Sequence, residues 1–428
     1  MAEYLKQGWR HDAARSEEVV KTVSRILHDV ETEGLPAIRR YSEQLDNWNP
    51  ESFVVSADEI AKAREAVPDE LGRELEFALG QVRNFAAKQR ETLTDLEVET
   101  LPGVVLGHRH IPVDAVGSYS PGGRYPLIAS SIMTVAVPKT AGVRTVVAAA
   151  PPREAAGIYP PQLYTMDLAG ADVILCLGGV QAFAALAFGV EDVKGVDMVV
   201  GAGNAFVAEA KRQLFGTVGI DLLAGPTEVA VIADETADPR LVAADLLGQA
   251  EHGPNSPALL VTTSRPFGQA VLSEVDRWLA GQWPTKEVAG AAWREHGAVV
   301  VADSLEEAAA ISDSYAPEHL EVQTADDDWY FEHLRNYGSL FVGPESTVAY
   351  SDKSIGTNHV LPTGRAARYT GGLWVGKFLK TVTYQRLTPE GGALVAPSTA
   401  AIADAELMFG HALTARLRLE ERTGSTPR

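Results

Sequence analysis

Three short polar segments contain most of the side chains that could do chemistry: QAEHG at 249–253, APEHLE at 316–321 and SDKSIGTNHVLPT at 351–363. Gln249, His252 and Asp352 offer an amide oxygen, an imidazole and a carboxylate, which are ligands that suit a zinc-type ion. Glu318 and His319 place a carboxylate beside an imidazole, the composition of a general acid–base pair. Together the segments predict a metal site next to a site of proton transfer.

Each of these segments also has a plainer interpretation. Gln249 and His252 are three residues apart and would share one face of a helix, but a polar helix end would account for a single histidine equally well. Glu318 and His319 are adjacent, and adjacent residues on a helix or strand do not face each other. One site can use both only where the backbone turns, and Pro317 favours a turn or a helix start there.

Two glycine-rich turns follow predicted strands. GSYSPGGRYP at 117–126 and GAGNAF at 201–206 would let the backbone approach a phosphate or a substrate closely. GAGNAF lacks a complete dinucleotide fingerprint. A plain turn between a strand and a helix explains either segment when it is taken alone.

The segment after the third polar stretch is basic, in a chain with 57 acidic and 37 basic side chains. Arg365, Arg368, Lys377 and Lys380 lie close together in sequence, and Arg124 lies in the first glycine-rich turn. The patch is either an anion site for a substrate or a cofactor phosphate, or a solvated face of the protein.

Composition limits the classes of protein to consider. The 428 residues favour two or three domains, and 46% hydrophobic residues provide an ample core. A net charge of −20 disfavours nucleic acid and anionic membrane as partners, because phosphate-rich surfaces bind basic proteins. Cys176 is the only cysteine, no apolar run approaches a membrane span, and the first residues lack a signal-peptide core. A cytoplasmic location is therefore expected.

Hydrophobic periodicity predicts helices over 16–47 and 57–92, then strands over 104–119. Strands and helices alternate after that. The predicted strands are 143–152, 171–179, 196–204, 229–234, 257–264, 298–303 and 338–343, and the predicted helices are 160–169, 180–189, 205–216, 241–253, 267–281 and 305–314. This alternation implies parallel sheets, whose ligands bind beyond the carboxyl ends of the strands.

The predicted fold is α/β, with two incomplete Rossmann-like parallel-sheet domains, a helical N-terminal segment and an extended C-terminal tail. The expected divisions are an N-terminal arm at 1–15, a discontinuous α/β domain of 16–116 and 229–371, a second α/β domain at 117–228, and a tail at 372–428. The tail is less regular in pattern. Its helix at 403–422 has little core of its own and is expected to pack on another element or another subunit.

The polar segments and the stretches between them, in this order, resemble the histidinol dehydrogenase family. The matching motifs are SYSPGG, LGGVQAFAALAFG, GAGNAFVAEAKRQ, LLAGPTEVAVIAD, DLLGQAEHG, APEHLE and GTNHVLPT. They extend from about 117 to 363, with weaker likeness over most of the remaining chain. One motif alone would mean little, whereas seven in one order do not arise readily by chance.

The resemblance implies an NAD-dependent dehydrogenase that oxidises an alcohol through an aldehyde to an acid, on a homodimer with one zinc ion per site. It also implies that the domain at 117–228 binds NAD. The residues implied are the zinc ligands Gln249, His252, Asp352 and, from the partner subunit, His411; the catalytic pair Glu318 and His319; the NAD contacts Tyr119, Gln181 and Asn204; and the substrate contacts Thr227, His359 and Glu406.

Other segments resemble a paralogous branch of the family that includes sulfopropanediol 3-dehydrogenase, namely RYPLIAS, QLDNW, AEHGPNSPA and ARYTGGLWVGKFLKT. That enzyme oxidises 2,3-dihydroxypropane-1-sulfonate to sulfolactate. An anionic substrate would account for the basic patch and for Arg124 as a substrate contact. The favoured function is therefore oxidation of a small anionic diol, and the alternative within the family is L-histidinol. A non-catalytic paralogue that binds metal and ligand is the alternative of another class, against which the intact catalytic and zinc positions argue.

Overall fold

A computed structural model describes residues 2–8, 16–154, 156–281 and 283–423. Part of the expected N-terminal arm, 9–15, therefore lies outside the described residues. The chain forms two compact units: Met1–Gln89 with Val113–Phe378, and Arg90–Pro112 with Leu379–Arg428. None of the described helices combines the length and the low charge that crossing a membrane requires.

The first unit contains a six-stranded sheet in the order β1–β11–β10–β9–β12–β13. Its strands are β1 (Glu3–Lys6), β9 (Val229–Ala233), β10 (Ala258–Thr262), β11 (Gly297–Val301), β12 (His319–Gln323) and β13 (Ser339–Val342). All neighbours are parallel except β1, which pairs with β11 in the antiparallel sense. Every side chain of β9 and β10 is buried, as expected for parallel strands covered on both faces.

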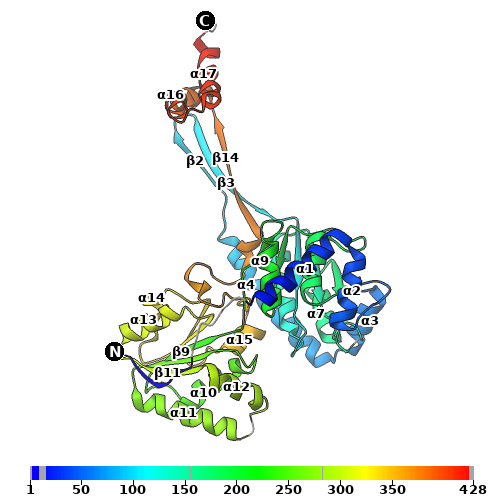
Figure 1. Cartoon of the computed structure of the whole chain (residues 1–428). Helices are drawn as coiled ribbons and strands as arrows, with labels where there is room; N and C mark the ends of the chain where they lie inside the picture. Colours follow the sequence, from blue (N-terminus) through cyan, green and yellow to red (C-terminus); the bar gives the residue numbers. More distant parts are fainter. Residues whose placement is uncertain (1, 9–15, 155, 282, 424–428) are drawn as a thin grey trace. The chain divides into compact units, whose positions relative to one another are not determined.

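Helices cover both faces of this sheet (Figure 1). One buried cluster joins it to α10 (Pro239–Ala250), α11 (Arg265–Ala280) and α12 (Lys286–His296). A second cluster joins the other face to α13 (Leu305–Tyr315) and α14 (Asp327–His333). The short helix α15 (Val348–Lys353) follows β13 and packs near α10.

A second sheet of the first unit has five parallel strands in the order β6–β5–β4–β7–β8. They are β4 (Ala115–Tyr119), β5 (Thr145–Ala150), β6 (Val173–Cys176), β7 (Met198–Val200) and β8 (Gly219–Ile220). The helices between them are α5 (Ile128–Ser131), the π-helix η1 (Ile132–Ala136), α6 (Val137–Ala141), α7 (Pro160–Ala169), α8 (Gly179–Phe188) and α9 (Ala205–Leu214). The predicted parallel α/β architecture is thus confirmed.

The two long helical stretches predicted near the N-terminus are each divided in two. The observed helices are α1 (Glu17–Glu33), α2 (Leu35–Asp46), α3 (Ala57–Ala66) and α4 (Asp69–Glu91). Gly34, at φ +67°, separates α1 from α2, and Val67 and Pro68 separate α3 from α4.

Helices α1 and α2 share one buried core with the five-stranded sheet, to which Val23, Ile38, Val147 and Leu175 contribute. The expected grouping of 16–116 with 229–371 therefore differs from the observed packing. Periodicity identifies the apolar face of a helix, but it does not identify the sheet which that face covers.

The second unit is an antiparallel sheet in the order β14–β3–β2 with two helices. Its elements are β2 (Leu96–Leu101), β3 (Val104–Pro112), β14 (Leu379–Leu387), α16 (Pro389–Ala405) and α17 (Phe409–Thr423). The expectation of a less regular tail was wrong, because β14 pairs with β3 along its whole length, a contact between segments far apart in sequence. The single helix predicted over 403–422 was also wrong, since the chain turns between α16 and α17 with Leu407 at φ +60°.

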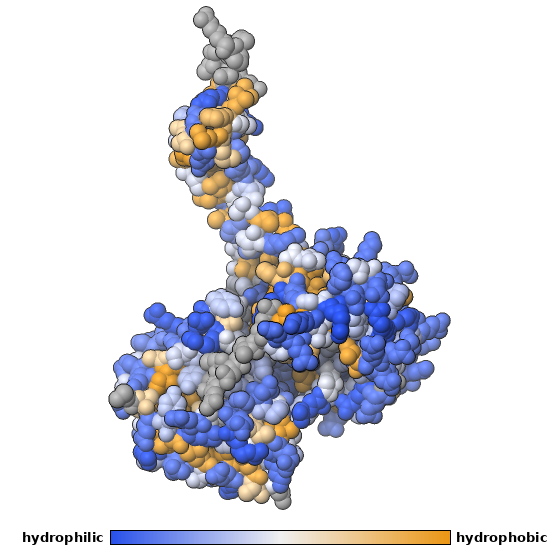
Figure 2. Space-filling view, viewed as in Figure 1, coloured by the Kyte–Doolittle hydropathy of each residue, from blue (hydrophilic) through white to orange (hydrophobic). Residues whose placement is uncertain are grey.

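This unit buries little apolar surface. The cluster between α16 and α17 consists of five alanines, Ala396, Ala400, Ala403, Ala412 and Ala415. Large apolar side chains remain exposed on both helices and in the turn between them, and Figure 2 shows orange surface in this part of the chain. They are Leu394, Ile402, Leu407, Met408, Phe409, Leu413 and Leu417.

Candidate active site

The acid–base pair lies at the start of β12, where Glu318 immediately precedes the strand. The parallel register pairs His319 with Val229 of β9, so both members of the pair lie beside Thr227 and Glu228. The Glu318 Oε2 atom accepts hydrogen bonds from the Thr227 hydroxyl at 2.5 Å and the Glu228 backbone N–H at 3.0 Å. The predicted turn is therefore a strand start, and it brings the adjacent carboxylate and imidazole into one site.

The His319 ring is buried and held through one nitrogen. Its Nδ1 lies 3.0 Å from the Glu228 backbone carbonyl, which can only accept, so Nδ1 carries the proton in the neutral ring. Its Nε2 is buried without a partner among the described residues and lies 3.9 Å from Asp352 Oδ1. In the neutral ring, Nε2 therefore carries an unshared electron pair in the interior of the site.

Charges around His319 govern its proton affinity. Burial lowers the pKa of His319, but the neighbouring Glu318 and Asp352 carboxylates outweigh burial and raise the pKa to about 9. Glu318 Oε2 lies 3.4 Å from His319 Nδ1. A cation beside Asp352 would oppose this rise, because it would compensate one of the two negative charges.

The three predicted metal-binding residues of this unit converge near His319. Gln249 lies in the last turn of α10, His252 follows that helix, and Asp352 lies in α15. The His252 Nε2 and Asp352 Oδ2 atoms are 3.9 Å apart. The Gln249 amide Nε2 donates to Thr227 Oγ1 at 2.6 Å, so the amide oxygen is the atom that could bind a metal ion.

The chemistry of these three residues fits a zinc-type ion. Metal–ligand bonds of about 2.0–2.2 Å place two ligand atoms of one ion roughly 3–4 Å apart. Burial lowers the pKa of His252 and favours the neutral ring that binds metal. Although burial alone would raise the pKa of Asp352, the surrounding His359, His319 and Lys353 lower it overall, so the carboxylate is ionised. The carbonyl end of α10 also favours a cation.

The described residues contain no group of three His, Cys, Asp or Glu side chains placed to hold a metal ion. The candidate set includes an amide ligand, Gln249, and its fourth predicted member, His411, lies in the second unit. His411 and the predicted substrate contact Glu406 are both exposed in that unit.

The predicted substrate contact His359 is engaged through both ring nitrogens. Its Nδ1 lies 3.0 Å from the Asp352 backbone carbonyl, and its Nε2 lies 2.9 Å from the Ser130 hydroxyl. Ser130 lies in the short helix α5, which continues directly into the π-helix η1. π-Helices are rare, and they are frequent at functional sites. Sequence reasoning missed Ser130 and also Glu228, whose buried carboxylate accepts the Gly364 N–H at 2.8 Å.

The predicted cofactor contacts lie together at the carboxyl ends of the five-stranded sheet. Tyr119 ends β4, and its hydroxyl accepts the Gly179 N–H at 3.1 Å, at the start of α8. Gln181 is fully buried in α8, and Asn204 caps α9 by accepting the N–H groups of Phe206 and Val207. The starts of two helices at this edge suit a phosphate-bearing ligand.

A buried ion pair fixes the glycine turn after β7. The Lys211 Nζ donates to the Gly201 carbonyl at 2.8 Å, and Asp221 Oδ2 accepts the Gly201 N–H at 2.8 Å. Lys211 and Asp221 also contact each other, at 2.5 Å. Gly201 has φ +128°, and a Cβ there would lie 2.2 Å from the Tyr119 carbonyl oxygen, so only glycine fits.

The expectation that ligands bind beyond the carboxyl ends of the strands fits only the five-stranded sheet. Glu318 and His319 lie at the amino end of β12, and Thr227 and Glu228 precede β9. The candidate catalytic site therefore lies at the amino edge of the six-stranded sheet. The loop that follows β4 of the five-stranded sheet contacts the segment that follows α10. In this contact the Tyr125 hydroxyl donates to the Glu251 carbonyl at 3.2 Å.

The structure divides the predicted basic patch. Lys380 belongs to the second unit, whereas Arg124, Arg365, Arg368 and Lys377 belong to the first. Arg365 has φ +67°, uncommon for arginine, and its Nε is buried without a partner among the described residues. Its neighbour Gly364 donates to Glu228, which places this turn beside the catalytic pair.

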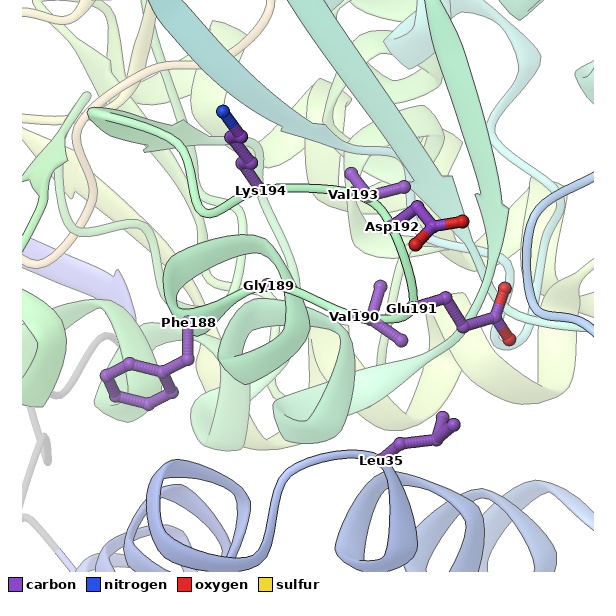
Figure 3. A pocket seen from close by; sticks show the side chains of 8 residues that line it. All are labelled: Leu35, Phe188, Gly189, Val190, Glu191, Asp192, Val193 and Lys194. Carbon is purple, nitrogen blue, oxygen red and sulfur yellow. The ribbon is translucent and has the colours of Figure 1, made fainter.

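A surface depression of about 500 Å³ lies away from this chemistry (Figure 3). It is lined by Leu35 and by the loop 188–194 between α8 and β7, on the side of the sheet where β7 begins. Glu191 in this loop accepts hydrogen bonds from the Phe53 N–H and the Ser52 hydroxyl, so its carboxylate stabilises the loop. The convergence of polar groups near His319 is a better criterion for a site than the size of this depression.

The fold and site together define an α/β protein with a buried acid–base pair, and the comparisons with known proteins identify the family. The family model for histidinol dehydrogenase matches residues 10–419. The chain is 52% identical to the histidinol dehydrogenase homolog of Shouchella clausii, over 98% of this chain and 99% of that protein. It is 48% identical to the sulfopropanediol 3-dehydrogenase of Ruegeria pomeroyi, over 97% and 96%. The crystal structure of histidinol dehydrogenase from Elizabethkingia anophelis superposes with a TM-score of 0.91 at 35% identity, covering 96% of this chain and 94% of that one.

The chain belongs to the histidinol dehydrogenase family. Members of this family are NAD-dependent oxidoreductases that act on CH–OH groups and generally bind zinc.

The Thr227 hydroxyl links the Gln249 amide to the Glu318 carboxylate, so its removal should weaken both sides of the site. We expect Thr227→Val to lower the free energy of unfolding by about 1–3 kcal/mol, because a buried carboxylate loses a donor. Thr227→Ser keeps the hydroxyl and should resemble the wild type. Urea unfolding at fixed protein concentration, with a chelator present, measures both; equal stability of the two variants would refute the bridging role.

Proposed function

We propose that the protein is a zinc-binding, NAD-dependent dehydrogenase that oxidises a primary alcohol through an aldehyde to a carboxylate, using two NAD. The observation that carries this proposal is the buried Nε2 of His319, which has no hydrogen-bond partner in the described part of the chain and lies near Glu318, Gln249, His252 and Asp352. A base, a second carboxylate and a set of metal ligands are then available to one bound alcohol.

In the first oxidation, His319 Nε2 takes the hydroxyl proton while the carbon-bound hydride passes to NAD. The bond from Nδ1–H to the Glu228 carbonyl fixes the ring and stabilises the imidazolium that forms. Zinc, when bound by Gln249, His252, Asp352 and the partner's His411, would supply positive charge that orients and polarises the substrate oxygen.

In the second oxidation, water must add to the aldehyde. The described hydrogen bonds to the Glu318 carboxylate both fall on Oε2, which leaves Oε1 to take a proton from the attacking water. Glu318 passes this proton to the former aldehyde oxygen, so that a hydrate with two hydroxyl groups forms. His319 then accepts one hydroxyl proton of the hydrate as the second hydride leaves to a second NAD. Each oxidation thus releases one hydride and one proton, and the acid keeps the oxygen of the added water.

The favoured substrate is a small anionic diol such as 2,3-dihydroxypropane-1-sulfonate. Support comes from Arg365, a cation without a described acidic partner next to the catalytic pair, and from the 48% identity to a sulfopropanediol 3-dehydrogenase. Arg124, in the glycine-rich loop beside Tyr125, is the second candidate contact. L-Histidinol is the second candidate substrate, because the related solved structure is a histidinol dehydrogenase at 35% identity.

We further propose a cytoplasmic homodimer in which the second unit completes the site of the other subunit. The alanine core of α16 and α17 and the exposed apolar side chains on both helices favour burial against another subunit. His411 would then reach the partner's Gln249, His252 and Asp352. No nucleic acid or membrane is proposed as a partner.

The substrate proposal predicts NADH formation with the sulfonated diol, and little with glycerol, its uncharged counterpart, or with L-histidinol. Arg365→Gln and Arg124→Ala should each raise the KM for the sulfonate by about tenfold or more, since a hydrogen bond between charged groups is lost. The KM for NAD should not change. Lys194→Ala removes an exposed cation at the far edge of the sheet and is the control. Efficient turnover of L-histidinol with no response to anionic diols would reject this substrate.

The two half-reactions should respond differently to changes in the catalytic pair. His319→Ala should lower the rates of alcohol and aldehyde oxidation by roughly 10²–10⁴-fold, because the same base serves both. Glu318→Gln should lower mainly aldehyde oxidation, which alone requires activated water. Single-turnover NADH formation from alcohol and from aldehyde separates the steps. Equal, small losses for both variants in both steps would contradict the assigned roles.

The shared site predicts complementation between inactive subunits. His252→Ala and His411→Ala homodimers should each lose zinc by elemental analysis, whereas His28→Ala, at an exposed histidine of α1, should retain it. A mixed dimer of the two inactive chains should regain one complete site, with zinc and activity. Mixed dimers without activity, or a fully active monomer by light scattering, would overturn the exchange of His411.

A further inference from the structure

Asp46 is the last residue of α2, and its carboxylate lies against the glycine turn that begins α8. A Cβ on Gly178 would lie only 3.0 Å from Asp46 Oδ2 and 3.3 Å from Oδ1. This turn follows β6, at the same edge of the sheet as Tyr119 and Asn204. The carboxylate is therefore part of the candidate cofactor site, although it comes from a helix about 130 residues earlier in the chain.

Gln181 connects Asp46 to the start of α8. Its Nε2 donates to Asp46 Oδ2 at 2.7 Å, which fixes the orientation of the amide. Its Oε1 is buried without a partner among the described residues and lies close to Gly179, where a Cβ would be 3.1 Å from it. The turn thus presents two acceptors, a carboxylate and an amide oxygen, beside the N-terminus of a helix.

The position of Asp46 is unfavourable for a carboxylate that serves only the fold. It lies at the carbonyl end of α2, where negative charge is disfavoured, and the last turn of this helix has no basic residue. Burial raises the pKa of Asp46, and the Gln181 amide only partly opposes that rise. No described lysine or arginine forms a salt bridge with it. Such a cost is typical of a residue kept for a ligand.

Other charged groups near this edge are already engaged. Arg39 of α2 donates to the carbonyls of Pro50 and Glu51, and Arg153, in the loop after β5, stacks on Tyr159. The Asp46 carboxylate and the Gln181 amide oxygen both accept hydrogen bonds, and the carboxylate is negatively charged. A neutral group with hydroxyl donors, such as a ribose diol, matches this pair. A 2′-phosphate on that ribose would meet the Asp46 charge at short range.

Resting on the proposed NAD-dependent function, we infer that Asp46 selects NAD over NADP by accepting a hydrogen bond from a ribose hydroxyl and repelling a 2′-phosphate. Gln181 holds the Asp46 carboxylate toward the turn, and its free oxygen offers a second acceptor to the same ligand. Asp46 is thus a specificity-determining residue that takes no part in proton or hydride transfer.

The test is isothermal titration calorimetry of NAD and NADP on the full-length protein, without substrate. Asp46→Asn keeps the shape and the acceptor for Gln181 but removes the charge. The ratio of NAD to NADP affinity should fall by about tenfold or more, through weaker NAD binding and stronger NADP binding. Steady-state KM values for the two cofactors should change in the same direction.

Two further variants keep the result decisive. Asp192→Asn removes an exposed charge from the loop at the opposite edge of the sheet and should leave the ratio unchanged. Asp46→Glu keeps the charge, so it should bind NAD more weakly and still reject NADP, even if Asp46→Asn fails to fold. An unchanged ratio in Asp46→Asn, NADP binding by Asp46→Glu, or a wild type that prefers NADP overturns the inference alone. A wild type that binds neither dinucleotide overturns the proposed function itself.

Discussion

The parallel pairing of β12 with β9 determines the geometry of the candidate site. Adjacent side chains of a strand point to opposite faces, so Glu318 and His319 can act together only where the strand begins. The register that sets His319 opposite Val229 brings Thr227 and Glu228 to both residues at once. The backbone of Glu228 donates its N–H to Glu318 and accepts from His319 through its carbonyl. A shift of the β12–β9 register by one residue would break both contacts.

The helix ends near the catalytic pair and those near the predicted cofactor contacts favour ligands of opposite charge. Helix α10 ends at Gln249, and its free carbonyls carry roughly half a negative elementary charge, which favours a cation. Helices α8 and α9 begin beside Gln181 and Asn204, and their free N–H groups favour an anion. A cation and a phosphate group would therefore be favoured at different edges of different sheets. The contact of Tyr125 with Glu251 links the two halves.

Sequence patterns located most strands and helices of the two parallel sheets, because buried parallel strands are short apolar runs between glycine turns. They also pointed to Gln249, Glu318 and Asp352, which lie near His319, but not to Glu228. They could not show that these residues lie at the amino edge, since local pattern contains no information on which end of a strand meets another segment. Strand β12 was missed because its polar residues, His319, Glu321 and Gln323, do not form the apolar run expected of a central strand.

Contacts between distant segments explain the other omissions. Strand β14 gains its order from pairing with β3, about 270 residues earlier, so the tail pattern alone was uninformative. Ser130 had a weak signal, a polar pair before an apolar helix, and its role depends on His359 in another loop. Asp46 lies in the segment QLDNW, which resembles the paralogous branch but indicates no role for the carboxylate, because its interaction with Gln181 exists only once α2 packs on α8.

The polar face of β12 has a structural reason that bears on the site. Gln323 donates to Asp245 of α10 at 3.1 Å, and Glu321 accepts the Val348 N–H of α15 at 3.1 Å. Burial and the neighbouring Asp245 charge raise the pKa of Glu321, so this network costs stability. In return it fixes the two elements that carry Gln249 and Asp352 against the strand that carries His319. The position of α10 matters because a displacement by one helical turn would move Gln249 by about 5.4 Å.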